Sequence, residues 1–142
     1  MFNYNTVKME ETSIVINLTV EQRENVLVAH LLFFNNSSIK YYLDKYTICY
    51  NGEFTREVFK IIDEKNNKLD YMGAMIKRKI KPEDFMPLDS GDSIKTRVIL
   101  NNVYRLRRGR KYSIQYTVFN LDYLRVQEIM LIESNKVDVV YQ

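Results

Sequence analysis

Residues 111–119 read KYSIQYTVF, and the strict alternation of apolar and polar side chains in this stretch decides the fold class. The apolar positions are Tyr112, Ile114, Tyr116 and Val118. Successive side chains of an extended strand point to opposite faces of a sheet, so these side chains share one face and the polar ones share the other. The stretch is therefore predicted to be a β-strand whose tyrosine-bearing face lies in the core.

Similar patterns recur along the rest of the chain. Residues 13–20 (SIVINLTV) alternate, which predicts a strand buried on one side. Residues 26–34 (VLVAHLLFF) are apolar nearly throughout, which predicts a central strand covered on both faces or partly by loops. Further strands are predicted at residues 39–43, 46–50, 57–62, 69–72, 94–100, 126–132 and 137–141. A helical turn at residues 81–85 and turns at Asn51-Gly52 and residues 87–93 separate some of them. Such spacing is typical of a sandwich or barrel.

The composition is typical of one folded domain. The chain has 142 residues, of which 46% are hydrophobic and 27% charged. No internal repeat, low-complexity tract or linker divides the sequence. We therefore expect residues 1–142 to form a single β-sandwich domain, with residues 1–11 as a flexible N-terminal segment.

Charge and the scarcity of cysteine and histidine exclude several classes of function. The net charge of +3 is too small to argue by itself for wrapping a polyanion. Cys49 and His30 are the single residues of their kind, so neither an intrachain disulfide nor a zinc site of several Cys or His ligands can form. We expect no metal and no cofactor. The sequence shows neither a leader pattern nor an apolar run of membrane-spanning length, which favours a cytoplasmic location without membrane contact.

From Gly73 the sequence reads GAMIKRKIKPEDFMPLDSGDSIKTRVILNNVYRLRRGRKYSIQY. An ordered series of motifs begins just before this stretch and runs through it. Its residues are Tyr71, Gly73, Met75, Lys77, Arg78, Pro82, Phe85, Leu88, Gly91, Ser93, Tyr104, Gly109, Tyr112 and Tyr116. Their series resembles the N-terminal β-sandwich domain of deuterolysin-type (aspzincin) zinc metallopeptidases. The sequence departs from the family at Ser90, where a proline is usual, and in the wider spacing of Gly109 and Tyr112. The family's catalytic His-Glu-x-x-His motif does not occur in this sequence, so the resemblance implies the accessory domain without the peptidase activity.

Two groups of basic residues are the candidate partner-binding sites. The first surrounds Gly109, where a β-turn is predicted, and comprises Arg105, Arg107, Arg108, Arg110 and Lys111. The second alternates with apolar residues and comprises Lys77, Arg78, Lys79 and Lys81. Either group could hold an acidic protein surface, phosphates or nucleic acid. The alternative interpretation is a solvated loop for the first group and, for the second, an edge strand whose charges prevent it from pairing with another strand. Whether the two groups form one patch stays open at this point.

The remaining reactive residues favour structural roles. His30 lies in a predicted strand with no nucleophile or orienting carboxylate recognisable nearby, and Cys49 alternates with aromatic residues as a small buried side chain does. The three carboxylates Asp84, Asp89 and Asp92 lack the spacing of a known calcium loop. The eleven tyrosines suit either protein-interaction hot spots or a core with hydrated hydroxyl groups.

Together these observations predict an all-β protein, an immunoglobulin-like antiparallel β-sandwich of about seven to nine strands. We expect a non-catalytic protein-binding module rather than an enzyme. The resemblance implies a peptidase-associated inhibitor, an immunity-type partner of a toxin or a chaperone-like partner, contacting a peptidase or toxin through loops or an edge strand. Two alternatives are nucleic-acid or polyanion binding through the arginine-rich turn, and a structural or assembly subunit.

Overall fold

The computed structural model describes residues 13–121 and 129–142, and the named strands within them pair with one another in antiparallel fashion. The first sheet has the strand order β1-β2-β6. Its strands are β1 (Ile14–Arg23), β2 (Val26–Asn35) and β6 (Ser93–Ile99). β1 and β2 form a hairpin in which Ile14 lies opposite Asn35 and Arg23 opposite Val26.

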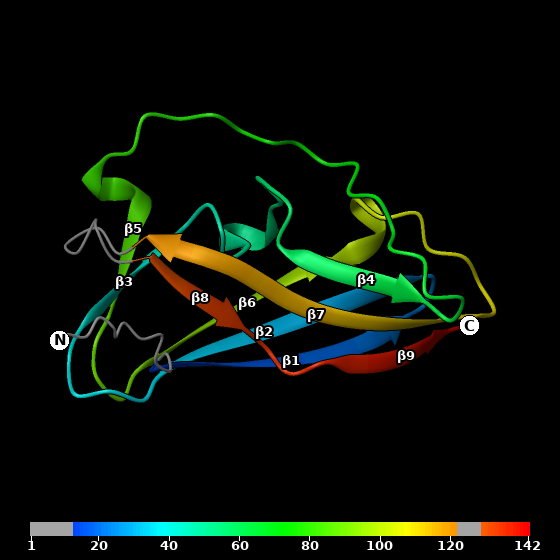
Figure 1. The fold of residues 1–142 in the computed structure, drawn as a ribbon, viewed down its shortest axis with the longest axis horizontal. Helices are drawn as coiled ribbons and strands as arrows, with labels where there is room; N and C mark the ends of the chain where they lie inside the picture. Colours follow the sequence, from blue (N-terminus) through cyan, green and yellow to red (C-terminus); the bar gives the residue numbers. More distant parts are fainter. Residues whose placement is uncertain (1–12, 122–128) are drawn as a thin grey trace, which may run out of the picture.

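The second sheet is built around the long strand β7 (Arg110–Leu121). One side of β7 pairs with β4 (Phe59–Asp63). The other side pairs first with β9 (Val137–Tyr141) and then, farther along, with β8 (Ile129–Glu133). Figure 1 shows the two sheets lying over one another, with β8 and β9 following each other along the same side of β7.

A two-stranded ribbon stands beside the sandwich and consists of β3 (Tyr41–Asp44) and β5 (Phe85–Leu88). The side chain of Asn120 connects this ribbon to β7. Its Oδ1 accepts a hydrogen bond of 3.0 Å from the backbone N–H of Asp44, and its Nδ2 donates one of 3.3 Å to the carbonyl of Tyr42. Asn120 is fully buried, so its amide satisfies backbone groups that would otherwise be left unpaired at the end of the sheet.

The strand pairing is that of an immunoglobulin-like sandwich. The order β1-β2-β6 corresponds to immunoglobulin strands A, B and E, and β4-β7-β9 corresponds to C, F and G. A tyrosine at the start of strand F binds the backbone upstream, as in the immunoglobulin tyrosine corner: the Tyr112 hydroxyl accepts a hydrogen bond of 2.8 Å from the N–H of Arg107. The expectation of an immunoglobulin-like antiparallel sandwich is confirmed, with nine strands in the described residues.

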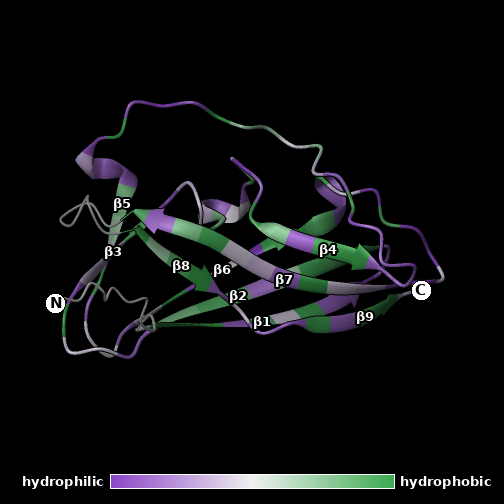
Figure 2. Cartoon of the chain, in the orientation of Figure 1, coloured by the Kyte–Doolittle hydropathy of each residue, from purple (hydrophilic) through white to green (hydrophobic). Residues whose placement is uncertain are grey.

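The core lies between the two sheets. The predicted inward face of β7 is confirmed, because Tyr112, Ile114, Tyr116 and Val118 are all buried. The Tyr116 ring meets Phe33 of the first sheet and Phe59 of β4 in edge contacts, with ring centroids 5.5 and 5.8 Å apart. Figure 2 shows the alternation of polar and apolar residues along β7 that produces this division.

A short seam joins β1 to the second sheet. Ile16 forms a parallel bridge with Ser134, in the stretch between β8 and β9. Asn135 completes the seam through two hydrogen bonds to Leu18. Its Oδ1 accepts a hydrogen bond of 2.8 Å from the N–H of Leu18, and its Nδ2 donates one of 3.0 Å to the carbonyl of the same residue. One amide side chain thus occupies the position of a neighbouring strand and fixes β8 beside β1.

Two local predictions were wrong, and a third, the turn at residues 87–93, was right only from Asp89 onward. Residues 46–50 form turns that lead into the 3-10 turn η2 (Tyr50–Gly52), and Cys49 has a positive φ of 57° that no strand residue has. Residues 69–72 form no strand, although the N–H of Leu69 donates to the carbonyl of Ile61 at 2.8 Å. A strand, β5, occupies part of the segment expected to be a turn after Pro87.

Other local expectations hold or fall outside the described residues. The helical turn expected at residues 81–85 is the 3-10 turn η3 (Pro82–Asp84), with proline at its first position. The N-terminal segment 1–11 and residues 126–128 of the predicted strand 126–132 lie outside the described residues. Within the described ranges, no helix has the length and apolarity needed to cross a membrane.

Candidate binding surfaces

The turn at Gly109 begins strand β7 and carries the first group of basic residues. Gly109 has a positive φ of 82°, which favours glycine, and its N–H donates a hydrogen bond of 2.6 Å to the carbonyl of Tyr141. Arg108 does not extend into solvent as a free cation. Its guanidinium binds the carbonyl of Gln142 at 3.0 Å and the side-chain oxygen of Asn25 in the β1–β2 turn. Arg108 therefore ties three chain segments together at this end of the sandwich.

Arg110 is also engaged within the molecule. Its Nε lies 2.7 Å from a carboxylate oxygen of Glu64, and another guanidinium nitrogen lies 3.3 Å from Asp63. The pKa of Asp63 is lowered, chiefly because the backbone N–H of Asn67 donates to its carboxylate, and the pKa of Arg110 is raised chiefly by its hydrogen bond to Glu64. Two acidic groups thus balance Arg110, so it contributes little net positive charge to a binding surface.

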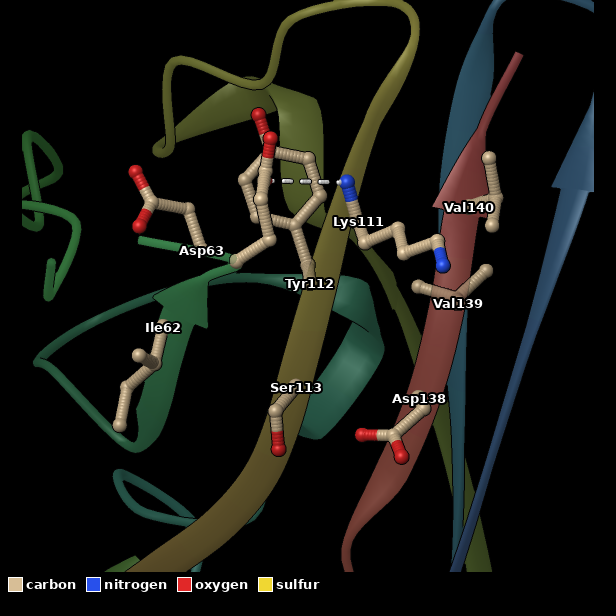
Figure 3. A pocket seen from close by; sticks show the side chains of 9 residues that line it. Ile62, Asp63, Lys111, Tyr112, Ser113, Asp138, Val139 and Val140 are labelled. Carbon is tan, nitrogen blue, oxygen red and sulfur yellow. Dashed lines mark hydrogen bonds between the residues drawn. The ribbon is translucent and has the colours of Figure 1, made fainter. Parts of the chain in front are cut away.

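Three members of the first group remain free. Arg105, Arg107 and Lys111 are exposed, and their side chains form no ion pair with any residue in the described ranges. Lys111 borders a shallow hollow of about 400 Å³ on the outer face of β7, between β4 and β9 (Figure 3). Asp63, Glu64 and Asp138 also line it, and the backbone N–H of Lys111 donates 3.3 Å to Glu64. Its charges are mixed, which does not favour a polyanion.

The structure divides the second group, because Arg78, a candidate partner-binding residue, is engaged within the molecule. Its side chain is only 11% exposed and forms ion pairs with Asp44 and Asp84, the latter at 3.1 Å. The guanidinium also stacks 4.0 Å above the centre of the Tyr46 ring. Lys77, by contrast, is exposed. Figure 1 places η3 and β5 at the opposite end of the sandwich from the Gly109 turn, so the two basic groups do not form one patch.

His30 and Cys49 have surroundings that favour structural roles. The Nε2 of His30 lies 3.0 Å from Glu21, whose pKa is lowered chiefly by this hydrogen bond. Glu21 also binds the Nε of Arg23 at 2.6 Å, so His30 belongs to a surface charge network on the first sheet. Cys49 is buried, and burial raises the pKa of its thiol to about 12.

Several tyrosines are core residues with satisfied hydroxyl groups. The Tyr104 hydroxyl donates to the Phe59 carbonyl at 3.1 Å, and the Tyr116 hydroxyl donates to the Thr47 carbonyl at 2.7 Å. Tyr112 and Tyr141 are buried as well. For these four residues the core interpretation is correct and the hot-spot interpretation is wrong.

Sequence reasoning missed an exposed apolar ladder on the outer face of β7 and β8. Phe119 lies directly opposite Leu131, and Leu121 lies opposite Ile129. Phe119 is 69% exposed, Ile129 64% and Leu131 41%. A signal was present in the sequence, because Phe119 is the one aromatic residue on the otherwise polar face of residues 111–119. We call Phe119, Leu121, Ile129 and Leu131 the β7–β8 ladder.

No protein-family model matches the chain, and no curated protein matches it either. Among the residues described, no group of three or more His, Cys, Asp or Glu side chains is arranged to hold a metal ion. The β7–β8 ladder contains Phe119, whose exposed fraction of 69% is the largest among the exposed large apolar side chains of the described residues.

Proposed function

We propose that this protein is a non-catalytic binding module that recognises another protein through the β7–β8 ladder. The observation that carries the proposal is the exposure of Phe119 and Leu131 as a directly opposed pair on an immunoglobulin-like sheet. Exposed aromatic and large aliphatic side chains that adjoin one another mark protein-binding sites more often than isolated ones do.

The edge of β8 adds a backbone component to this surface. Ser134 donates its N–H to the Tyr116 carbonyl at 2.9 Å, and hydrogen-bonded pairs alternate along an antiparallel ladder. The backbone groups of Leu131 consequently point away from β7, on the side where β1 meets the chain at Ser134, and no described residue pairs with them. β8 also lacks the lysine or proline with which many exposed edges prevent pairing. A partner could therefore use hydrogen bonds as well as apolar contacts.

The alternatives are less well supported by the described contacts. Polyanion binding through the Gly109 turn is weakened because Arg108 and Arg110 are held by partners within the chain. A structural or assembly subunit would use the same β7–β8 ladder with a second copy as its partner. A peptidase or a toxin is the partner class that the sequence resemblance implies, and a cytoplasmic location stays a prediction.

Affinity capture with matched variants tests the proposal. The double variant Phe119→Ser/Leu131→Ser removes the central pair of the ladder, and Val15→Ser removes an apolar side chain of the other sheet that is 50% exposed. We expect the wild type and Val15→Ser to retain the same protein partner at high salt, and the double variant to lose it. Molecular mass in solution shows whether the partner is a second copy. Capture that is unchanged in the double variant, or capture of nucleic acid that disappears with Arg105→Ala/Arg107→Ala, would contradict the proposal.

A further inference from the structure

The segment from Met72 to Lys81 forms a second exposed surface, made by a different part of the chain from the β7–β8 ladder. We call residues 72–81 the connector, because they link the region after β4 to η3 and arch over the molecule in Figure 1. Its exposed apolar side chains are Met72, Met75, Ile76 and Ile80, of which Met75 is 68% exposed. This density of exposed large apolar residues exceeds what scattered surface positions normally show.

The connector is held in place although it belongs to no sheet. The N–H of Ile76 donates a hydrogen bond of 2.9 Å to the carbonyl of Thr55. The guanidinium of Arg56 donates one of 3.0 Å to the carbonyl of Ile76. Farther along, Arg78 joins the connector to Asp44 and Asp84 through its ion pairs. The exposed side chains between these attachments are therefore presented on a fixed backbone, which lowers the entropic cost of binding.

Positive charge accompanies the apolar side chains. Lys77, Lys79 and Lys81 are exposed and form no ion pair with any other residue in the described parts of the chain. Asp70 and Glu83 are exposed carboxylates two residues beyond the two ends of the connector and form no ion pair with its lysines, whereas Asp84 is buried against Arg78. Met75 also borders a hollow of about 610 Å³ together with Lys60 and Thr117. The connector thus combines adaptable apolar side chains with uncompensated cations.

We propose that the connector is a docking site for a protein segment in which acidic and apolar side chains alternate. Charge complementarity identifies the occupant, because Lys77, Lys79 and Lys81 would pair with its carboxylates while Met72, Met75 and Ile80 contact its apolar side chains. Methionine is flexible and polarisable, so it adapts to such side chains without a deep pocket. Met75 borders the outer face of β7 at Thr117, two residues before Phe119, so this site adjoins the β7–β8 ladder but is made by a different segment of the chain.

A protein segment fits the connector better than an anionic membrane does. Lipid surfaces are typically bound by clusters of about four to eight basic residues, more than the three free lysines found here. The backbone groups from Lys77 to Ile80 form no hydrogen bond with any described residue. Burying unpaired N–H and C=O groups in acyl chains is costly, whereas a protein segment supplies partners for them.

Fluorescence anisotropy with a short labelled peptide of alternating Leu and Glu tests the proposal on the full chain. Control probes are a Leu-Lys peptide, a Ser-Glu peptide and vesicles containing phosphatidylserine. We expect the Leu-Glu peptide to bind best and to lose affinity as salt is raised. The variants Met75→Ser/Ile80→Ser and Lys77→Glu/Lys79→Glu should each weaken binding about tenfold, a loss typical of removing contact residues.

Matched controls separate this site from other surfaces. Lys65→Glu changes an exposed lysine in another loop, and Val15→Ser alters an exposed apolar residue of the first sheet, so both should bind the Leu-Glu peptide like the wild type. Far-ultraviolet circular dichroism checks that each variant is folded. Absence of Leu-Glu binding, equal binding of the Leu-Lys peptide, unchanged affinity in both connector variants, or stronger binding of vesicles than of the peptide would overturn the proposal.

Discussion

The hydroxyl oxygen of Tyr112 accepts a hydrogen bond of 2.8 Å from the backbone N–H of Arg107, five residues upstream. This bond closes the loop that leads into β7 and fixes the direction in which the Gly109 turn leaves the sandwich. We expect Tyr112→Phe to unfold at lower urea concentration, with a loss of about 1 kcal/mol from the missing hydrogen bond. Tyr42→Phe is the matched control, because no described residue binds the hydroxyl of Tyr42. Equal urea midpoints for the two variants would show that the corner bond adds no stability.

The ion pairs of Arg78 give a larger expected effect. Asp44 and Asp84 are both buried beside its guanidinium, so Arg78→Met would leave two carboxylates without their cation. We expect a loss of about 3–5 kcal/mol in the free energy of unfolding, as when one partner of a buried ion pair is removed. Lys79 is exposed, so Lys79→Met should change the free energy of unfolding by no more than about 0.5 kcal/mol. Chemical denaturation of both variants measures the difference, and similar midpoints would contradict the structural role of Arg78.

Asn135 makes the seam between β1 and the second sheet, and its removal should loosen that seam. Asn135→Ala loses two hydrogen bonds to Leu18, which predicts a stability loss of about 1–2 kcal/mol. Hydrogen exchange adds a local readout, because the Leu18 amide should exchange faster in this variant than in Lys136→Ala. Unchanged exchange at Leu18 would mean that the side chain of Asn135 does not hold β1 in solution.

Burial of Cys49 predicts a thiol that is unreactive in the native state and a stability that falls in alkali. Its pKa is raised from the model-compound value of 9.0 to about 12, so the unfolded chain ionises first as the pH rises. The contribution of Cys49 to stability is therefore fully present below about pH 9 and is lost progressively toward pH 12. Cys49→Ala should show a smaller alkaline decrease in the free energy of unfolding. Rapid labelling of the native thiol by a thiol reagent at pH 8 would contradict this account.

The sequence predicts those parts of the fold that depend on local alternation. The inward face of β7 follows from residues 111–119, because the period of two is sufficient to separate its buried and exposed side chains. Residues 46–50 show the same aromatic alternation but form turns, since Cys49 takes a left-handed conformation that the pattern does not encode. Tertiary contacts, here the burial of Cys49 and Ile48, replace strand pairing in that segment.

The candidate sites were less predictable because they depend on contacts between distant residues. Arg78 was a candidate partner-binding residue, but it pairs with Asp44, which lies 34 residues away in the sequence. Arg110 is likewise balanced by Asp63 and Glu64 across the sheet pairing of β4 and β7. The β7–β8 ladder could have been found from Phe119 alone, since an aromatic residue on a polar strand face is itself a signal of an exposed contact site.

Site-specific photo-cross-linking in cells tests most directly the claim that this chain is a protein-binding module. A photoreactive phenylalanine analogue replaces Phe119, and in a separate variant it replaces Asn17, an exposed residue of β1 on the first sheet. We predict a discrete cross-linked product containing a second protein chain from position 119 and none from position 17. No product from position 119, or the same products from both positions, would contradict the account.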